Sequence, residues 1–339
     1  MRILGRLYGR VAAWRRAWYD ADPSRRRTLQ HPVISVGNLA VGGSGKTPAV
    51  AAIARLLLQR GEHPAILSRG YGRRDVTDGV VVVSDGQTVL APATRSGDEP
   101  QMLARALSGV PVLVARERFL AGCLAERQFG ATVHLLDDGF QHLPLGRDIE
   151  LVIVSRDDLE ADLLPAGRLR ESLATARRAD AILVPGSLDD VSAVEARLGG
   201  RVFRLVARYE PLRVMGPEQR SDNPAPQPGP GTPVVAAAGI ARPERFFAAL
   251  RDCGFDVRRE IRFRDHHWFS AADVQAIEQA ATEVGAAVIV TTEKDAVRLP
   301  TRPRWCYLPM AVAVEPEAVF SDWLAARLQD ARERRGTAA

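Results

Sequence analysis

The chain has 339 residues, of which 46% are hydrophobic and 26% charged. This length accommodates two domains, and the composition is that of a globular protein and not of a disordered one. No run approaches the roughly 20 apolar residues that a membrane-spanning helix requires. The three cysteines are widely spaced and odd in number, which argues against a disulfide framework and fits a reducing, cytoplasmic compartment.

The net charge of +5 favours anionic partners, among which nucleic acid is only one class. Of the 46 Lys and Arg residues, only Lys46 and Lys294 are lysines. An ammonium is a compact point charge, whereas a guanidinium is a wide planar fork. Because the chain uses Arg at almost every other basic position, we expect Lys46 and Lys294 to lie where a guanidinium would not fit. For Lys294, chance is the alternative explanation.

Residues 1–22 predict an amphipathic helix with a basic polar face. Its apolar members recur at spacings of three and four residues: Ile3, Leu4, Leu7, Tyr8, Val11, Trp14 and Trp18. Trp and Tyr beside Arg are typical of a helix that lies in a membrane surface. The alternative is a helix that packs this stripe against its own protein. A cleaved signal peptide is not expected, because Arg10, Arg15 and Arg16 interrupt the apolar region.

From residue 31 onward, apolar runs alternate with helical patterns, which predicts an α/β fold with a mostly parallel sheet covered on both faces. The expected strands are 32–36, 64–68, 79–83, 111–114, 132–136 and 150–154. The expected helices are 47–60, 99–107 and 117–128.

The domain boundaries are predicted from a Pro- and Gly-rich stretch at 221–233, interpreted as a hinge or linker. It separates a core domain at 23–220 from a smaller α/β domain at 234–339. Within the smaller domain we expect strands 234–238 and 286–291, helices 242–252 and 270–283, and a C-terminal helix after Glu315. That helix has Phe320, Trp323, Leu324 and Leu328 on one side.

A phosphate-binding loop of the Walker A type occupies residues 40–47. Its residues are Ala40, Val41, Gly42, Gly43, Ser44, Gly45, Lys46 and Thr47. The loop follows a predicted strand and opens a predicted helix, as the motif requires. Backbone N–H groups and the helix N-terminus would bind phosphate oxygens. Lys46 would reach the β- and γ-phosphates of ATP, and the Thr47 hydroxyl would ligate Mg²⁺.

The segment LLDDGFQH ends an apolar strand in Asp137 and Asp138, which is the Walker B arrangement for holding Mg²⁺. Two adjacent carboxylates repel each other unless a cation or hydrogen-bond donors lie nearby. The alternative is a simple DDG turn, which the Walker A loop upstream makes less favoured.

The segment SGDEP offers Asp98 and Glu99 just before a predicted helix. Acidic residues followed by proline are typical of a helix start, which is the structural explanation. A carboxylate near the γ-phosphate could also orient an attacking alcohol and accept its proton. Two further segments, RGYGR at 69–73 and GRLRE at 167–171, could contact phosphates. The paired histidines of DHHW follow Asp265 without a third metal ligand, which excludes zinc.

Together these segments resemble the tetraacyldisaccharide 4′-kinases of Gram-negative lipid A biosynthesis. The matching motifs run in order from residue 37 to residue 297: GNLAVGGSGKTP, SRGYGR, GDEP, LLDDGFQH, LLPAGRLRE, GIARPERFF, DHHWF and VTTEKDAV. The combination of GDEP and LDDGFQH downstream of this loop is far more specific than any single motif.

The resemblance implies two α/β/α lobes joined by a hinge, with the P-loop in the larger lobe. The implied reaction moves the γ-phosphate of Mg-ATP to the 4′-hydroxyl of a lipid A disaccharide 1-phosphate. It implies that Asp98 is the catalytic base and that a histidine of DHH supports it, with His266 favoured over His267. It further implies metal binding by Asp137 and Asp138, and roles for Arg170 in catalysis and Glu171 at the metal.

The family works at the cytoplasmic face of the inner membrane, and we expect this chain to lie on an anionic membrane surface. A monomer is expected, with no nucleic-acid partner. The rival function is a membrane-associated P-loop ATPase or GTPase switch. Partitioning ATPases carry a lysine where Val41 stands, and guanine selection uses Asn where Glu293 stands.

Overall fold

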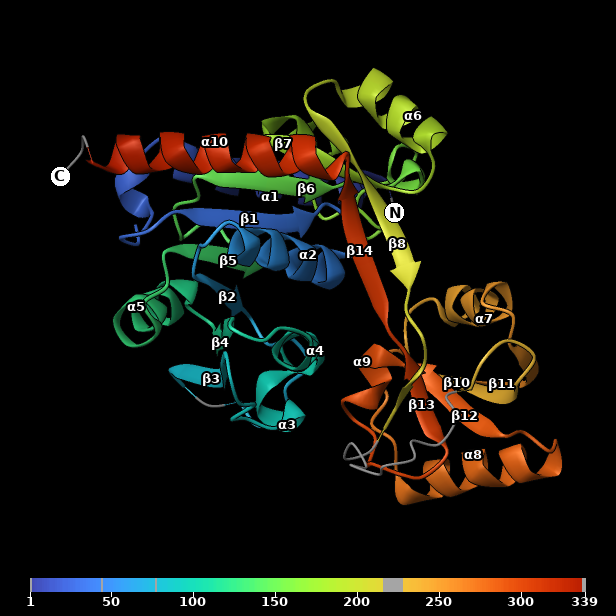
Figure 1. Cartoon of the computed structure of the whole chain (residues 1–339). Coiled ribbons are helices and arrows are strands. Elements are labelled where there is room, and N and C mark those ends of the chain that lie inside the picture. Colours follow the sequence, from blue (N-terminus) through green and yellow to red (C-terminus); the bar gives the residue numbers. More distant parts are fainter. Residues whose placement is uncertain (1, 44, 77, 216–227, 337–339) are drawn as a thin grey trace. The chain divides into compact units, whose positions relative to one another are not determined.

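The computed structural model describes residues 2–43, 45–76, 78–215 and 228–336. The chain forms two compact units, one comprising Met1–Ala207 with Val312–Ala339 and the other Arg208–Ala311 (Figure 1). Each unit contains a mostly parallel sheet with helices on both faces, so the predicted α/β fold class is confirmed.

The larger unit is built on a nine-stranded sheet with the order β14-β8-β7-β6-β1-β5-β2-β4-β3. Its strands are β1 (Val33–Asn38), β2 (Pro64–Ser68), β3 (Val80–Asp85), β4 (Pro111–Ala115), β5 (Val133–Asp137), β6 (Ile149–Ile153), β7 (Ala181–Pro185), β8 (Val202–Tyr209) and β14 (Met310–Glu315). Neighbours from β4 to β8 pair in parallel, whereas β3 pairs antiparallel with β4. The phosphate-loop strand β1 therefore lies at the centre, beside the Walker B strand β5.

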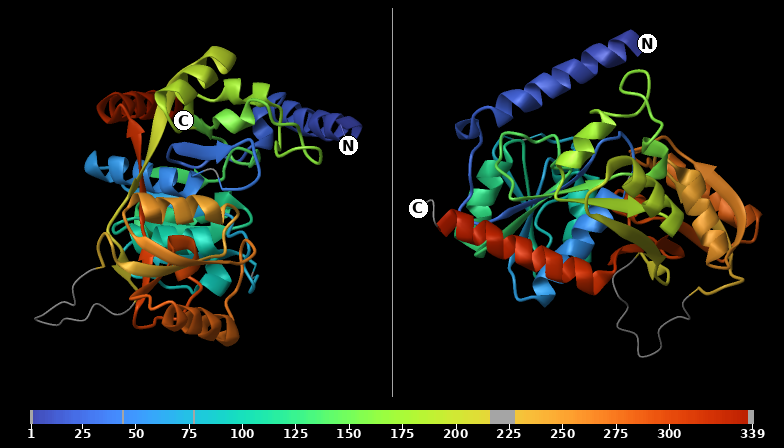
Figure 2. Two further views of the ribbon diagram at one scale, coloured as in Figure 1. Left: turned by 90° about the vertical axis from the view of Figure 1, so that its right-hand side faces the viewer. Right: turned by 90° about the horizontal axis from the view of Figure 1, so that it is seen from above.

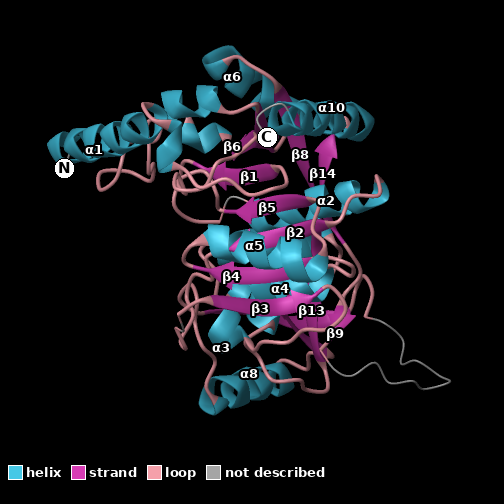
Figure 3. Cartoon of the chain, turned by 90° about the vertical axis from the view of Figure 1, so that its left-hand side faces the viewer, coloured by secondary structure: helices cyan, strands magenta, loops and turns pink. Residues whose placement is uncertain are grey.

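Helices cover both faces of this sheet (Figure 3). On one face, α2 (Lys46–Gln59), α4 (Asp98–Ala106) and α10 (Glu317–Gly336) share a core with alternate strand residues such as Ile34 and Leu135. On the other face, α5 (Arg118–Phe129) and α6 (Leu188–Leu198) pack on the intervening residues. The remaining elements are α1 (Arg2–Asp20), α3 (Ala93–Ser96) and the 3₁₀ helices η1 (Pro23–Arg25), η2 (Arg156–Asp158) and η3 (Leu173–Arg178).

The smaller unit has a five-stranded sheet with the order β11-β10-β12-β13-β9. Its elements are β9 (Arg213–Val214), β10 (Pro233–Ala238), α7 (Pro243–Asp252), β11 (Asp256–Arg262), α8 (Ala271–Glu283), β12 (Val288–Thr292), α9 (Glu293–Ala296) and β13 (Trp305–Leu308). Helix α7 packs on one face of the sheet and α8 on the other. Only β9 is antiparallel among the described pairings.

The predicted domain limits need correction at two places. The C-terminal helix α10 was assigned to the second domain, but it belongs to the larger unit together with the end of β14. Phe320, Leu324 and Leu328 are buried there, in the same core as α2, so the predicted apolar face of the helix is confirmed. The second unit also starts at Arg208, before the predicted linker, of which 221–227 lie outside the described residues.

The predicted N-terminal helix is confirmed as α1, which runs along the outside of the larger unit (Figure 2). Its apolar stripe is exposed: Leu4, Leu7, Tyr8, Val11, Trp14 and Trp18 have exposed fractions of 40–69%. The alternative that these side chains pack against their own protein is therefore wrong. No helix in the described part of the chain has the length and apolar character that crossing a bilayer demands.

Candidate active site

The phosphate-binding loop lies where β1 ends and α2 begins, as predicted. Ala40 is buried, Val41 to Gly43 are exposed, Gly45 caps α2, and Lys46 and Thr47 form its first turn; Ser44 lies outside the described residues. Gly42 and Gly45 have φ angles of 100° and 82°, which side chains with a Cβ rarely adopt. The loop thus presents backbone N–H groups at the N-terminus of a 14-residue helix.

The GRLRE segment at 167–171 is hydrogen-bonded to the phosphate loop and to the residue before it. The Val41 N–H donates to the Arg168 carbonyl at 2.8 Å, and the Arg170 N–H donates to the Leu39 carbonyl at 2.6 Å. The GRLRE segment is therefore joined to the loop through the backbone, which places the Arg170 side chain at the site.

Lys46 is held at the carboxyl edge of the sheet by two oxygen atoms. Its Nζ donates to Asn38 Oδ1 at 3.1 Å and lies 3.6 Å from Asp138 Oδ1. Arg170 donates to both Asp138 oxygens, at 3.0 and 2.8 Å, and also to the Asn38 side chain. The structure thus brings together three of the predicted site residues, Lys46, Asp138 and Arg170.

The two Walker B carboxylates occupy different electrostatic environments. Burial, reinforced by the negative charges of Glu99 and Asp138, raises the pKa of Asp137 to about 7. Burial also opposes ionisation of Asp138, but hydrogen bonds from Arg170 and the charge of Lys46 outweigh it and hold the Asp138 pKa below its usual range. Asp138 is therefore an ionised partner of the basic residues, whereas at Asp137 burial and the nearby negative charges outweigh the opposing charges of Lys46 and Arg118.

Asp137 fits the role of a magnesium ligand. It ends β5, opposite Val36 of β1, and is only 5% exposed. Ser68 donates to Oδ2 at 3.5 Å, but Oδ1 is buried and accepts no hydrogen bond from any described residue. A buried carboxylate oxygen without a donor is suited to a hard cation. Asp137 and Thr47 are thus the residues that would hold Mg²⁺. Among the described residues there is no group of three or more His, Cys, Asp or Glu side chains that could hold a metal ion.

Glu171 does not fit the predicted metal role. Both of its carboxylate oxygens accept hydrogen bonds from Arg16 of α1, at 2.8 and 2.9 Å, and the residue is 6% exposed. Because its lone pairs are directed to a buried guanidinium, Glu171 is a partner of the N-terminal helix.

Asp98 is the first residue of α4 and is 4% exposed. Gly97 before it has a φ of 86°, and a Cβ there would lie 2.7 Å from the Tyr71 carbonyl oxygen. Likewise, a Cβ on Gly70 would lie 2.6 Å from the Ser96 carbonyl oxygen. The glycines of SRGYGR and SGDEP therefore let these two loops contact each other closely, which fixes the backbone that carries Asp98.

The two histidines of the smaller unit have different surroundings. His267 Nε2 lies 3.0 Å from Asp273 Oδ2, and its ring stacks on Phe263 with centroids 4.7 Å apart. His266 has a φ of 58°, and its Nε2 lies 3.1 Å from Lys294 Nζ.

The family model described as LpxK, tetraacyldisaccharide-1-P 4′-kinase, matches residues 1–329. This chain belongs to that family.

Relatives and a solved structure agree with this assignment. The chain is 43% identical over 336 residues to the tetraacyldisaccharide 4′-kinase of Nitrobacter winogradskyi, covering 96% of this chain and 90% of that protein. It is 40% identical over 306 residues to that of Koribacter versatilis, covering 88% of each. It is similar to the crystal structure of LpxK from Aquifex aeolicus in complex with ATP, with a TM-score of 0.78 and 31% identity, covering 96% of this chain and 97% of that one.

In this member of the LpxK family, two residues of the site were not predicted from the sequence. Asn38, the last residue of β1, accepts from Lys46 and is 1% exposed; its position two residues before the phosphate loop was an available signal. Arg118 of α5 is buried near both Walker B acids, and its Nη1 lies 3.1 Å from His142 Nδ1. Burial and the nearby Arg118 charge lower the pKa of His142 to about 3, so it is neutral. Arg118 could not be singled out from the sequence, because arginine is common throughout the chain.

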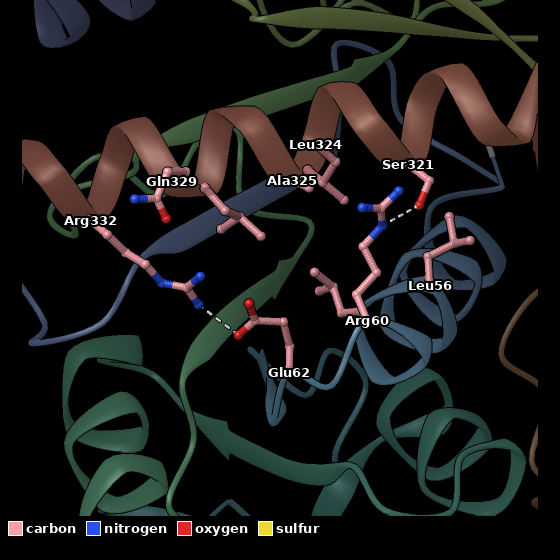
Figure 4. A pocket seen from close by; sticks show the side chains of 10 residues that line it. Leu56, Arg60, Glu62, Ser321, Leu324, Ala325, Gln329 and Arg332 are labelled. Carbon is pink, nitrogen blue, oxygen red and sulfur yellow. Dashed lines mark hydrogen bonds and ion pairs between the residues drawn. The ribbon is translucent and has the colours of Figure 1, made fainter.

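A hollow of 370 Å³ lies at the other end of α2, between this helix and α10 (Figure 4). Arg332 of α10 pairs with Glu62 at 2.6 Å, and Arg60 donates to the Ser321 hydroxyl at 2.7 Å. Because α2 rises about 1.5 Å per residue, its 14 residues place this hollow roughly 20 Å from Lys46. The hollow is a feature of α10 packing and not of the nucleotide site.

Proposed function

We propose that this chain transfers the γ-phosphate of ATP to the 4′-hydroxyl of tetraacyldisaccharide 1-phosphate, in lipid A biosynthesis. The observation that carries the proposal is a phosphate loop together with Asp137, whose buried Oδ1 accepts no hydrogen bond from a described residue, in a chain of the LpxK family. Asp98 begins α4, and the charge of its neighbour Glu99 acts on Asp137. A nucleotide switch needs the loop and the metal ligand, but it has no need of a base for an alcohol.

The residues of the larger unit would divide the work of phosphoryl transfer. The loop N–H groups and Lys46 would hold the β- and γ-phosphates, with Asn38 and Asp138 keeping the ammonium in place beforehand. When bound, Mg²⁺ at Thr47 and Asp137 would neutralise part of the phosphate charge. Arg170, fixed by Asp138, would add a second cation that stabilises charge on the transferring group.

Asp98 would act on the acceptor. Its carboxylate would orient the 4′-hydroxyl for in-line attack and accept its proton as the new oxygen–phosphorus bond forms and ADP leaves. By the family resemblance, His266 would support Asp98. The Lys294 contact and the unusual φ of His266 favour it over His267, whose ring is engaged by Asp273 and Phe263.

The proposal extends to the place of action. The exposed apolar stripe of α1 lies beside the exposed arginines Arg6, Arg10 and Arg15, a combination that suits a helix lying in an anionic membrane surface. Such a helix would hold the enzyme where a lipid acceptor resides, which we propose is the cytoplasmic face of the inner membrane. The predictions of a monomer and of no nucleic-acid partner stay predictions.

A direct test is the dependence of ADP release on the acceptor. Purified full-length protein in detergent, supplied with Mg-ATP, should release ADP rapidly only when tetraacyldisaccharide 1-phosphate is present. The disaccharide already phosphorylated at the 4′ position serves as the control lipid and should not stimulate release. ADP release at one rate with either lipid, or with none, would favour the switch ATPase.

A further inference from the structure

The N-terminal helix contacts the rest of the larger unit through a face of its own, opposite the apolar stripe. Gly5, Gly9 and Arg16 lie on this inner face, because residues spaced by four and by seven positions fall on one side of a helix. A Cβ on Gly9 would lie 2.7 Å from Leu163 Cδ1, and one on Gly5 would lie 3.2 Å from the Leu163 carbonyl oxygen. The glycines thus allow a close approach that brings Arg16 into the protein, where it is 5% exposed.

Arg16 makes more contacts than docking a surface helix requires. Its Nε and Nη2 donate to the two carboxylate oxygens of Glu171, and Nη2 also donates to the Phe140 carbonyl at 3.0 Å. Its guanidinium lies over the Phe140 ring, 4.4 Å from the centroid. One side chain therefore joins two segments that are 31 residues apart in the sequence.

Both segments carry active-site residues next to the positions that Arg16 binds. Glu171 directly follows Arg170, and Phe140 comes two residues after Asp138, so Arg16 holds the backbone on either side of the Arg170–Asp138 ion pair. Phe140 in turn packs on the phosphate-loop strand, since a Cβ on Gly37 would lie 2.5 Å from Phe140 Cβ. Asp138 of this ion pair also lies 3.6 Å from Lys46 Nζ, which connects Arg16 to the phosphate loop.

We infer that Arg16 is a positioning residue for the nucleotide site, and that it couples the position of helix α1 to binding of Mg-ATP. When Arg16 is in place, Glu171 and the Phe140 carbonyl hold Arg170 and the Walker B turn in the geometry that presents Asp138 to Lys46. When α1 moves, the same contacts are lost. The inference rests only on the nucleotide-binding half of the proposed function, and its tests need no acceptor lipid.

The coupling has a consequence that can be measured in the unaltered protein. Linkage is reciprocal, so Mg-ATP must stabilise the docked position of α1 by as much as docked α1 favours Mg-ATP. In hydrogen exchange of the full chain in detergent, Mg-ATP should slow amide exchange within residues 4–20 as well as in the phosphate loop. Protection of the loop with no change in α1 would overturn the inference.

The matched variants are Arg16→Met and Arg10→Met. Both remove one positive charge from α1, but Arg10 is exposed, whereas Arg16 is buried on Glu171. We expect Arg16→Met to weaken Mg-ATP binding, measured by titration calorimetry, about tenfold or more, because a buried hydrogen-bonded ion pair loses one partner. Arg10→Met should bind Mg-ATP as the unaltered protein does. If Arg16 served only to dock α1, Arg16→Met would expose α1 to protease without changing Mg-ATP affinity.

A second variant keeps the test decisive if the stranded Glu171 carboxylate prevents Arg16→Met from folding. Arg16→Met with Glu171→Met replaces the buried pair by apolar side chains, a change that preserves stability in many proteins. This variant still lacks the hydrogen bond to the Phe140 carbonyl and the anchor beside Arg170, so Mg-ATP binding should remain weakened. Unaltered affinity in this folded variant would refute the positioning role.

Discussion

At the scale of single residues, Asp98 is the residue on which phosphoryl transfer to an alcohol would depend most. We expect Asp98→Asn to lower turnover by about 10²–10⁴-fold, because the amide retains the shape but cannot accept the hydroxyl proton. Binding of Mg-ATP should stay within about twofold, since the nucleotide is held by the loop, Lys46 and the metal ligands. Steady-state kinetics and calorimetry measure the two quantities.

The control is Asp189→Asn, which removes an acid from the first turn of α6, where the side chain is exposed. This variant should keep full turnover. Near-normal turnover of Asp98→Asn would remove Asp98 from the catalytic role, and a large loss of Mg-ATP binding would show that it serves the nucleotide instead.

Lys294 is the second residue-scale prediction. Its ammonium donates to His266 Nε2 and lies 3.5 Å from Asp265, on a short helix anchored by the buried Asp295–Arg298 pair. Lys294→Met should lower turnover by about ten- to a hundredfold, because a supporting imidazole loses its orientation. The affinity for Mg-ATP should not change.

Lys294→Arg should not restore turnover, since a planar fork cannot place one donor at this distance in the same space. Arg302→Met, at an exposed basic position of the same unit, serves as the control and should retain turnover. Full activity of Lys294→Met would show that Lys294 has no role in turnover, and that the scarcity of lysine in the chain does not indicate a function at this position.

At the scale of elements, the exposed stripe of α1 yields a prediction on membrane binding. Replacing Trp14 and Trp18 by Ser should weaken binding to vesicles that contain anionic phospholipid by about tenfold or more, since a large apolar side chain contributes about 1.5–3 kcal/mol on burial. Co-sedimentation with vesicles measures the change. Leu188→Ser alters an apolar residue on α6 that is exposed to about the same extent as Trp14, and should leave binding unchanged. Equal binding by all these proteins would contradict a role of α1 at the membrane.

Strong local patterns predicted the elements well. The apolar runs of β1, β2, β4, β5 and β6 and the helical patterns of α2, α4, α5, α7, α8 and α10 appear within about two residues of their expected limits. The strand β11 was missed because it is an edge strand with the polar sequence DVRREIR and little burial. The two-residue strand β9 and the one-turn helices α3 and α9 are too short to leave a periodic signal. The apolar run of β7 offered a signal that the sequence analysis did not use.

The same contrast holds for the site. The Walker A and Walker B patterns predicted roles for Lys46, Asp137 and Asp138, whereas the roles of Asp98 and Arg170 were predicted from the family resemblance. Arg16 bonded to Glu171 could not be predicted, since the pair joins residues 155 apart and arginine is common throughout the chain. The sequence analysis therefore placed Glu171 at the metal by resemblance alone, whereas the structure places it against α1.

At the scale of the whole molecule, the Pro- and Gly-rich stretch at 221–233 does not mark the boundary between the two units. The Pro- and Gly-rich stretch lies within the smaller unit, because β9 precedes it and pairs with β13. The chain then returns to the larger unit through β14, which lies beside β8 at the end of the large sheet. Such a return is a long-range pairing that no local pattern reveals, and it explains why α10 was assigned to the wrong unit.

The central claim is that the γ-phosphate of ATP ends on the 4′-oxygen of a lipid disaccharide. Purified protein should be incubated with Mg-ATP and tetraacyldisaccharide 1-phosphate in detergent, and the lipid analysed by tandem mass spectrometry. The account predicts a product heavier by one phosphate, with fragments that place the added group on the non-reducing sugar. Hydrolysis of ATP with the lipid unchanged, or a phosphate added elsewhere on it, would contradict the account.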